Sequence, residues 1–410
     1  MEDRVIIVGA GHGGSQTAAS LRQEGFSGRI ALVNDETELP YHKPPLSKTF
    51  LKTADGGSQM LRPESFYRDN DVDLVFGRRV TSIDRQAGTV ALDDGTSMPF
   101  SHIILATGSR PRLPPIDDLT LDGVFALRNF ADAGRIRQAT EAAQSAVVVG
   151  GGFIGMEIAH TLASLGKHVT LLEMAPRVLG RSVAPAISAY ADARARAMGI
   201  DLRVATGVAG LEGSNGHVEA VRLADGSRVP ADLVILGTGV VPNVELAADA
   251  GLEIANGIVV DEAMRTADPR ILALGDAASF HHWHAARPVR LESVQNASDQ
   301  AKHAARTITG KVSPYRDVPW FWSDQGDIKL QTAGLSFDAD RFVLSGNPEE
   351  NAFSVWHFAG PRLLAVDSVN RAADHMIARR LLAAGVNPTD ADIAAGAPRL
   401  KELAQPRPAP

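Results

Sequence analysis

The sequence predicts an α/β fold: two related modules, the second inserted in the first, plus a C-terminal α+β domain with an antiparallel sheet. Three observations carry this prediction. A pattern of strand, glycine turn, helix and strand occurs twice along the chain. A strand–turn–strand stretch follows the second copy, and neither copy accounts for it. From about residue 316 onwards, apolar residues alternate with polar ones in the two-residue period of an antiparallel sheet.

The first copy begins near the N-terminus. "RVIIVGAGHGGSQTAASL" gives an apolar strand, a glycine turn and a helix of period near 3.6, and "RIALVND" gives a second strand that ends in acid. Further on, "TVALDDGTSMPF" predicts a hairpin that turns at Asp94-Gly95. "HIILATG" then predicts a strand that ends in a turn at Thr107-Gly108.

The second copy repeats this order. "SAVVVGGGFIGMEIAHTLASL" and "HVTLLEM" match the first copy, a hairpin turn follows at Asp225-Gly226, and "LVILGTG" ends in a turn at Thr238-Gly239. The stretch "GIVVDEAMRTADPRILALGDAA" comes next, and we assign it to the first module. The predicted domains are the first module at 1–112 and 238–315, the inserted module at 113–237, the C-terminal domain at 316–403 and a disordered tail at 404–410.

The composition excludes several classes of protein. Of the 410 residues, 44% are hydrophobic and 22% charged, as in an ordinary soluble protein. The net charge of -7 disfavours a nucleic-acid binder, which needs an electropositive surface. No apolar run reaches the roughly 18 residues of a membrane span and no signal-peptide pattern is present, so we expect a cytoplasmic protein without membrane partners. With 0 cysteines, any redox chemistry belongs to a bound organic cofactor or to a metal held by other ligands.

The glycine turn of the first copy has the spacing of a dinucleotide-binding loop. Gly9 permits the tight turn, Gly11 lets the backbone approach a pyrophosphate, and Gly14 lets the helix pack on the strand. The helix N-terminus offers unpaired N–H groups to the phosphates. Asp35 follows at about the 20-residue spacing of a ribose-binding acid.

The second copy repeats the loop with Gly150, Gly152 and Gly155, and Glu173 is its acid. Two Rossmann-like dinucleotide-binding modules in one chain are therefore predicted. A carboxylate at Glu173 bonds a free 2′-hydroxyl and repels a 2′-phosphate, which favours NADH over NADPH. Arg177 is the observation against this choice, because its guanidinium can turn toward a phosphate.

Further motifs resemble one family. "LPYHKPPLSK", "GGGFIGMEIA", "ESVQNASDQAK" and "WFWSDQ", together with both glycine loops, resemble the FAD-dependent NADH:ferredoxin reductases that serve bacterial cytochrome P450s and aromatic-ring dioxygenases. The resemblance runs from about residue 4 to about residue 400. It implies the glutathione reductase fold, with FAD on the first module and NADH on the inserted one.

The resemblance also implies site residues. Val80 and Val294 are expected as backbone or packing contacts, and ordinary core is the alternative for both. Trp322 either walls the flavin or conducts electrons, or it is a core or interface aromatic. The implied FAD contacts are Gly9, Gly11, Gly13, Gly14, Asp35, Lys48, Val80, Thr107, Gly108, Arg128, Gly275, Asp276, Val294 and Trp322; the implied NAD contacts are Gly150, Gly152, Ile154, Gly155, Glu157, Glu173 and Gly239; and the implied partner-docking residues are Arg62 and Lys302, for which solvated surface charges are the alternative.

Lys48 and Glu157 are the implied catalytic residues. In the family, a lysine and a glutamate at these positions lie beside the flavin, so we expect them to form an ion pair there. Helix-dipole compensation is the alternative role for Glu157. Pro44 and Pro45 stiffen the approach to Lys48 and push the preceding residues toward extended conformations, and Ser47 is a candidate helix N-cap.

The implied reaction moves two electrons as hydride from NADH to FAD, and then single electrons to a [2Fe–2S] ferredoxin that serves a cytochrome P450 or oxygenase. The protein is expected to be a monomer or weak dimer. Two alternatives stay open: a small-molecule reductase of the quinone or monodehydroascorbate type, and a signalling flavoprotein like apoptosis-inducing factor. The histidines of "FHHWH" lack the ligand spacing of a metal site, so no metal is expected.

Overall fold

The computed structural model describes residues 3–53 and 59–405, which form two compact units. Unit 1 contains residues 3–42, 59–110 and 241–317, and unit 2 contains residues 43–53, 111–240 and 318–405. Residues 43–53, which the predicted boundary put in the first module, thus group with the inserted module and the C-terminal part. The predicted domain boundaries stay predictions, and the last five residues of the predicted tail lie outside the described residues.

Unit 1 is built on a five-stranded parallel sheet in the order β19-β7-β1-β2-β3. Four strands, β19, β7, β1 and β2, are mostly buried because parallel sheets are covered on both faces, whereas the edge strand β3 is only partly buried. The elements of unit 1 are β1 (Arg4–Val8), α1 (His12–Gln23), β2 (Arg29–Asn34), α3 (Glu64–Asp69), β3 (Val72–Phe76), β4 (Val80–Asp84), β5 (Thr89–Leu92), β6 (Ser97–Pro99), β7 (His102–Leu105), α7 (Glu245–Asp249), β18 (Ile258–Val260), β19 (Ile271–Ala273), η2 (Gly275–Ala277), β20 (Ala278–His282), β21 (Arg287–Val289) and α8 (Val294–Ile308).

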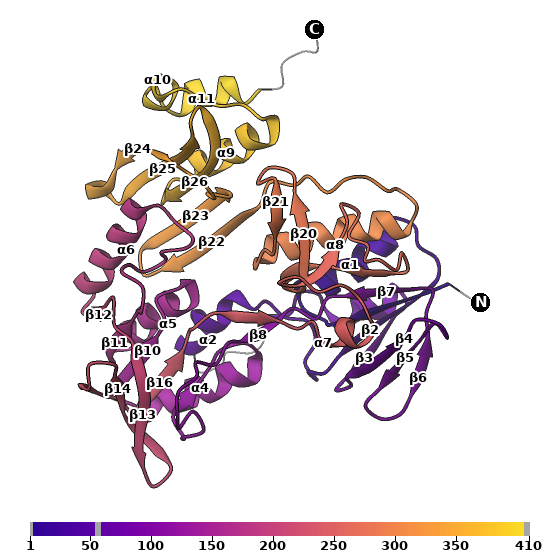
Figure 1. Ribbon diagram of the computed structural model, residues 1–410, viewed down its shortest axis with the longest axis horizontal. Coiled ribbons are helices and arrows are strands. Elements are labelled where there is room, and N and C mark those ends of the chain that lie inside the picture. The colour runs from indigo at the N-terminus through magenta and orange to yellow at the C-terminus, as the bar shows by residue number, and fades with distance from the viewer. Residues whose placement is uncertain (1–2, 54–58, 406–410) are drawn as a thin grey trace. The chain divides into compact units, whose positions relative to one another are not determined.

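Strand β19 comes from beyond the inserted module and pairs in parallel with β7. Its register aligns Ile271 with Ile103 and Ala273 with Leu105, so the late segment completes the first sheet. Helix α8, which follows β19, packs against α1 (Figure 1). The predicted hairpin is present as the antiparallel pair β5–β6, and Gly95 in its turn has φ +84°.

Unit 2 repeats the parallel sheet in the order β12-β11-β10-β16-β9. The elements of its inserted part are η1 (Pro44–Ser47), α2 (Thr49–Lys52), β9 (Val124–Phe125), α4 (Phe130–Ala142), β10 (Ser145–Val149), α5 (Phe153–Ser164), β11 (His168–Leu172), α6 (Pro185–Ala197), β12 (Asp201–Arg203), β13 (Val208–Ser214), β14 (His217–Leu223), β15 (Arg228–Pro230) and β16 (Leu233–Leu236). Two short strands, β8 (Ser109–Pro111) and β17 (Val240–Pro242), lie where the chain passes between the units.

The C-terminal part of unit 2 is an antiparallel sheet in the order β22-β23-β26-β25-β24 with helices packed on it (Figure 1). Its core contains the buried rings of Trp356 and Phe358, which pack with Leu381 of the first helix. The elements are β22 (Trp320–Gln325), β23 (Ile328–Gly334), β24 (Arg341–Asn347), η3 (Pro348–Glu350), β25 (Ala352–Ala359), β26 (Arg362–Val369), α9 (Ala372–Ala384), α10 (Asp390–Ala394) and α11 (Ala397–Leu403). The predicted fold class, two Rossmann-like modules plus an α+β domain, is confirmed.

One local expectation was wrong. The residues before and within the proline pair were expected to be extended, but Lys43 is in the αR region and residues 44–47 form the 3₁₀ turn η1. Backbone hydrogen bonds from Leu46 N to Lys43 O and from Lys48 N to Pro45 O close the turn, both at 3.0 Å. The prolines occupy its first positions, where a missing N–H costs nothing.

Candidate functional site

The first glycine loop joins β1 to α1 and is shaped by its own backbone. Gly9 has φ +102°, and a Cβ there would overlap the carbonyl oxygen of Ala106 on the neighbouring strand end. A Cβ on Gly14 would overlap the carbonyl oxygen of Gly9. Gly11, in contrast, has open space around the position of a Cβ, and no side chain caps the helix that it begins. The loop therefore leaves one open face lined by backbone N–H groups, which fits a pyrophosphate.

The second glycine loop, between β10 and α5, repeats this geometry. Gly150 has φ +108° and lies against the backbone of Gly237, and a Cβ on Gly155 would overlap the carbonyl oxygen of Gly150. Gly152 is the open position. Ile154, in the first turn of α5, is 47% exposed. The second loop fits a dinucleotide by the same criteria as the first.

In each module, a residue at the carboxyl end of the second strand accepts a hydrogen bond from the glycine loop. Glu173 accepts hydrogen bonds from Gly151 N at 2.6 Å and from Ala175 N at 2.7 Å, so its carboxylate lies at the loop. In the first module, Asn34 Oδ1 accepts from Ala10 N at 3.1 Å. The parallel registers of β1 with β2 and of β10 with β11 make Asn34 the equivalent of Glu173.

Asp35, the predicted ribose acid, lies one residue beyond that equivalent position. Its carboxylate forms an exposed ion pair with Arg79 at 3.1 Å. Asn34 is not an acid, so the expected spacing of a ribose-binding acid did not predict it; the strand register counted from the glycines does. The role of Asp35 stays a prediction.

Arg177 does not reach toward Glu173. Its guanidinium donates to the carbonyl oxygens of Gly180 at 2.5 Å and Val183 at 3.0 Å, so it stabilises the loop that leads into α6. With its guanidinium engaged in this way, Arg177 is a weaker argument for a 2′-phosphate and thus against NADH.

Four other predicted residues of unit 1 lie at the carboxyl edge of its sheet: Thr107, Gly108, Gly275 and Asp276. Thr107 donates to Asn243 O at 2.7 Å, Gly275 N donates to Gln300 Oε1 at 2.7 Å, and Asp276 accepts from Ser109 at 2.7 Å. Because β1, β7 and β19 are parallel neighbours, the residues that follow them lie at the edge that holds the glycine loop. Gly108 follows Thr107 there with φ +65°.

Val80 and Val294 occupy different elements of unit 1. Val80 is buried in β4, and Val294 is the first residue of α8, which Ser293 caps by accepting a hydrogen bond from Asn296 N. Gly13 lies against the side chain of Leu274, so its small size serves packing.

The predicted docking residues are engaged within unit 1. Arg62 donates to Ser15 at 3.1 Å and to Gln16 at 2.9 Å. Lys302 is 55% exposed on α8 and pairs with Asp299 at 3.0 Å. Their role in docking stays a prediction.

Unit 2 brings together the two predicted catalytic residues. Lys48 Nζ lies 3.0 Å from Glu157 Oε1, and the glutamate is only 4% exposed. Ser47 donates to Glu157 Oε2 at 2.6 Å and Ser323 donates to Oε1 at 2.7 Å. The predicted N-cap role of Ser47 is wrong, because α2 begins after Lys48 without a side-chain cap. The role of this ion pair toward a cofactor stays a prediction.

Three other predicted residues of unit 2 are Trp322, Arg128 and Gly239. Trp322 shares its face of β22 with Trp320, the two rings being 5.6 Å apart, whereas Ser323 faces α5 on the opposite side of the strand. The carbonyl oxygen of Arg128 accepts from Lys43 Nζ at 3.4 Å. Gly239, with φ +94°, follows β16 at the edge that holds the second glycine loop.

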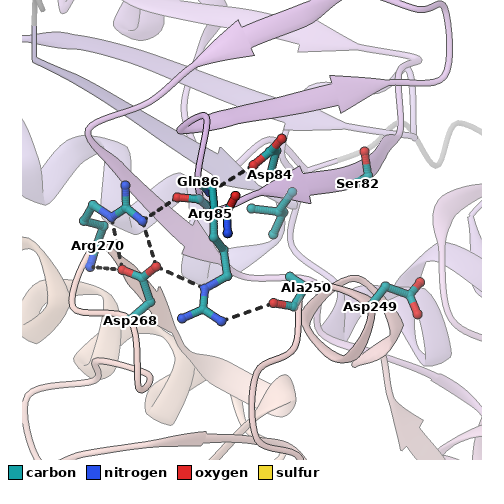
Figure 2. A pocket seen from close by; sticks show the side chains of 9 residues that line it. Ser82, Asp84, Arg85, Gln86, Asp249, Ala250, Asp268 and Arg270 are labelled. Carbon is teal, nitrogen blue, oxygen red and sulfur yellow. Dashed lines mark hydrogen bonds and ion pairs between the residues drawn. The ribbon is translucent and has the colours of Figure 1, made fainter.

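One open pocket of unit 1 is lined by none of the predicted site residues. It measures about 700 Å³, and Figure 2 shows Arg85, Asp268 and Arg270 bonded to one another along its wall. The hydrogen bond from Arg270, joined by one from Arg85, lowers the pKa of Asp268 to about 2. The carboxylate of Asp268 is thus held by two guanidinium groups, and we assign this cluster a structural role.

The sequence matches two protein families. The pyridine nucleotide-disulphide oxidoreductase family matches residues 3–301, and the reductase C-terminal family matches residues 320–404. Among residues 3–53 and 59–405, no helix combines the length and apolar character that crossing a bilayer requires.

Individual relatives resemble the chain over nearly its whole length. Rhodocoxin reductase of Rhodococcus erythropolis is 44% identical over 92% of this chain and 89% of its own. Putidaredoxin reductase of Pseudomonas putida is 43% identical over 93% of this chain and 92% of its own. The structure of the ferredoxin reductase for the CYP199A2 system from Rhodopseudomonas palustris superposes with a TM-score of 0.95 at 43% identity, over 98% of this chain and 100% of that one. The covalent putidaredoxin reductase–putidaredoxin complex gives 0.93 at 42% identity, over 98% of both chains.

Proposed function

This chain belongs to the pyridine nucleotide-disulphide oxidoreductase family, and we propose that it is an FAD-dependent NADH:ferredoxin reductase. The observation that carries the proposal is the duplicated glycine loop: each copy requires glycine where its backbone packs and leaves an open face for a pyrophosphate. One loop serves FAD and the other NADH. FAD, when bound, accepts two electrons together and releases them one at a time.

The residues of unit 2 favour NADH as the electron donor. Glu173 presents a carboxylate beside the second glycine loop, where it suits a ribose 2′-hydroxyl and repels a 2′-phosphate. Arg177, the residue that would have compensated a phosphate, donates to backbone carbonyl groups of its own loop. Glu173 binds and orients the adenosine ribose, and the N–H groups of the loop hold the pyrophosphate.

The partner is a ferredoxin. This assignment is supported by the names of the relatives, which include a ferredoxin–NAD(P)⁺ reductase of Sphingomonas, and by the putidaredoxin complex of a structural neighbour. With 0 cysteines, the chain itself has no disulfide to cycle, in contrast to what its family name suggests. We take the ferredoxin to be of the [2Fe–2S] type, feeding a cytochrome P450 or oxygenase, and the reductase to be a cytoplasmic monomer or weak dimer.

Reduction of cytochrome c with NADH tests the proposal. Rapid reduction is expected only when a [2Fe–2S] ferredoxin is added, because the ferredoxin carries single electrons between the proteins. NADPH should give a turnover at least about tenfold slower, the effect of placing a 2′-phosphate against Glu173. Equally fast reduction of a quinone or of cytochrome c without ferredoxin would contradict the assignment.

Lys48→Ala tests the predicted catalytic lysine. We expect the rate constant for flavin reduction by NADH to fall at least about tenfold, with FAD content unchanged, because the ammonium stabilises developing negative charge. Stopped-flow absorbance measures this rate. Lys52→Ala is the matched control, since Lys52 is an exposed lysine on the short helix that follows. A normal rate in Lys48→Ala would remove this residue from the mechanism.

A further inference from the structure

The carboxylate of Glu157 is held by three elements of unit 2 that lie far apart in the sequence. Ser47 comes from η1, Glu157 from α5 and Ser323 from β22, with sequence separations of 110 and 166 residues from the glutamate. Both serine side chains are buried, at 2% and 0% exposure. A buried carboxylate requires such partners, because an unpaired charge in this position costs several kcal/mol. Each of the two carboxylate oxygens thus has a hydroxyl donor of its own.

The direction of the Ser323 hydrogen bond is fixed by its neighbour. Gln325 Nε2 donates to Ser323 Oγ at 3.2 Å, so the serine oxygen acts as the acceptor there and its hydrogen is left to donate to Glu157. Gln325 is itself only 1% exposed. The alternation of β22 places Ser323 and Gln325 on one face of the strand, toward α5.

The Ser47 contact is fixed through the backbone. Thr161, one helical turn beyond Glu157 on α5, donates to the carbonyl oxygen of Ser47 at 2.9 Å. This buried bond ties η1 to α5 and keeps the Ser47 hydroxyl at Glu157 Oε2. Because Lys48 follows Ser47 directly, the same bond also sets where the lysine begins.

The ammonium group of Lys48 has N–H groups that Glu157 does not use. It has three N–H groups, and the one partner it has among the described residues is Glu157 Oε1. If the serines did not satisfy the carboxylate, its free lone pairs would compete for the remaining N–H groups of Lys48. With the serines present, the lysine is anchored by one contact, and its other N–H groups are available to a bound cofactor.

We propose that Ser47 and Ser323 are positioning residues for the reductase reaction. Their hydroxyl groups donate to the Glu157 carboxylate, so that the carboxylate holds Lys48 through one N–H group and leaves the other N–H groups of Lys48 available to the cofactor. This inference rests on the proposed function, because it assumes that Lys48 acts on bound FAD. Gln325 supports it by orienting the Ser323 hydroxyl. Neither serine touches the reacting groups in this scheme, and both act through the ion pair.

The test compares Ser47→Ala and Ser323→Ala with the wild-type holoenzyme. In stopped flow, each variant is expected to lower the limiting rate constant of flavin reduction about tenfold, the effect of one hydrogen bond to a charged group. The apparent Kd for NADH should stay within about twofold, because the second glycine loop is untouched. The midpoint potential of the bound FAD should become more negative, since Lys48 is drawn toward the carboxylate and away from the reduced cofactor.

Ser354→Ala is the matched control. Ser354 is 0% exposed and donates to the carboxylate of Asp374 at 2.9 Å in the same C-terminal sheet, so its loss removes a similar bond away from Glu157. We expect neither rate nor potential to change in Ser354→Ala, and Ser323→Thr, which keeps the hydroxyl, to recover most of the rate. In a Lys48→Ala background, Ser323→Ala should slow flavin reduction by less than about twofold, because both changes act through the same Lys48–Glu157 ion pair.

The outcomes separate this inference from the proposed function. If the wild-type protein fails to reduce a ferredoxin with NADH, the proposed function is wrong. If the wild type and Lys48→Ala behave as expected but both serine variants keep the wild-type rate and potential, the positioning role alone is overturned. The positioning role is equally overturned if Ser354→Ala slows reduction as much as Ser323→Ala does.

Discussion

At the scale of single residues, Gly152 and Gly155 of the second loop have different roles, one in binding and one in folding. A Cβ on Gly155 would overlap the carbonyl oxygen of Gly150, whereas a Cβ on Gly152 meets open space, and φ there is -78°. Gly155→Ala should therefore lower the free energy of unfolding by about 3 kcal/mol through overpacking. Gly152→Ala should cost less than about 1 kcal/mol but weaken NADH binding about tenfold, since the methyl group occupies the pyrophosphate side.

Thermal unfolding and NADH titration check both expectations. We expect Gly155→Ala to lose mainly stability and Gly152→Ala to lose mainly affinity for NADH. Similar losses of stability in both variants would mean that the open face of the loop has been misidentified.

At the scale of elements, the strands and glycine loops were predictable, and most of the side-chain partners were not. Alternation and helical period report which face of an element is buried, and they predicted the duplicated module and the return of β19. The period does not report what lies against that face. Ser323 donates to Glu157 across 166 residues, which no local pattern indicates. For Ser47, the neighbouring sequence suggests only helix capping, whereas its hydroxyl donates to Glu157. The family resemblance supplied Lys48 and Glu157, which the pattern alone would not have joined.

The packing of α9 against β22 yields a prediction at this scale. His375 on α9 is 1% exposed, lies 5.4 Å from the ring of Trp320, and has no hydrogen-bond partner on either ring nitrogen among the described residues. Burial, with Arg379 nearby, lowers the pKa of His375 to about 4. The neutral ring is therefore favoured in the folded state, and its contribution to stability is present above about pH 6.5 and is lost as the pH falls toward 4.

His375→Phe should remove this loss and raise the unfolding free energy at pH 5 by about 1 kcal/mol, since two unsatisfied nitrogens are replaced by apolar atoms. Denaturant unfolding followed between pH 7.5 and pH 4.5 measures both quantities. His168→Phe, at an exposed position, is the control and should leave the slope with pH unchanged. An unchanged slope in His375→Phe would show that other groups cause the acid sensitivity.

At the scale of the whole molecule, unit 1 must hold together two chain segments that the inserted module separates. The pairing of β19 with β7 joins their backbones. Asp268 joins their side chains, because it accepts from Arg85, 183 residues earlier, and from its neighbour Arg270 (Figure 2). Arg270 in turn donates to the carbonyl oxygen of Arg85 at 2.7 Å. One buried carboxylate thus fixes the second segment to the first outside the sheet.

Asp268→Asn tests whether this carboxylate holds the two segments together. The folded-state pKa of about 2 lies below the ordinary aspartate value of 3.8, so the carboxylate stabilises the fold fully above about pH 4, and that contribution is lost as the pH falls toward 2. At pH 7 we expect a loss of about 2 kcal/mol in the variant, the scale of hydrogen bonds to a charged group. The difference in Tm between wild type and variant should shrink between about pH 4 and about pH 2. Asp249→Asn is the control and should change Tm little at any pH, because Asp249 is an exposed carboxylate that lines the same pocket. If the Tm difference between wild type and Asp268→Asn stays undiminished at pH 2, the charge of Asp268 does not hold the two segments together.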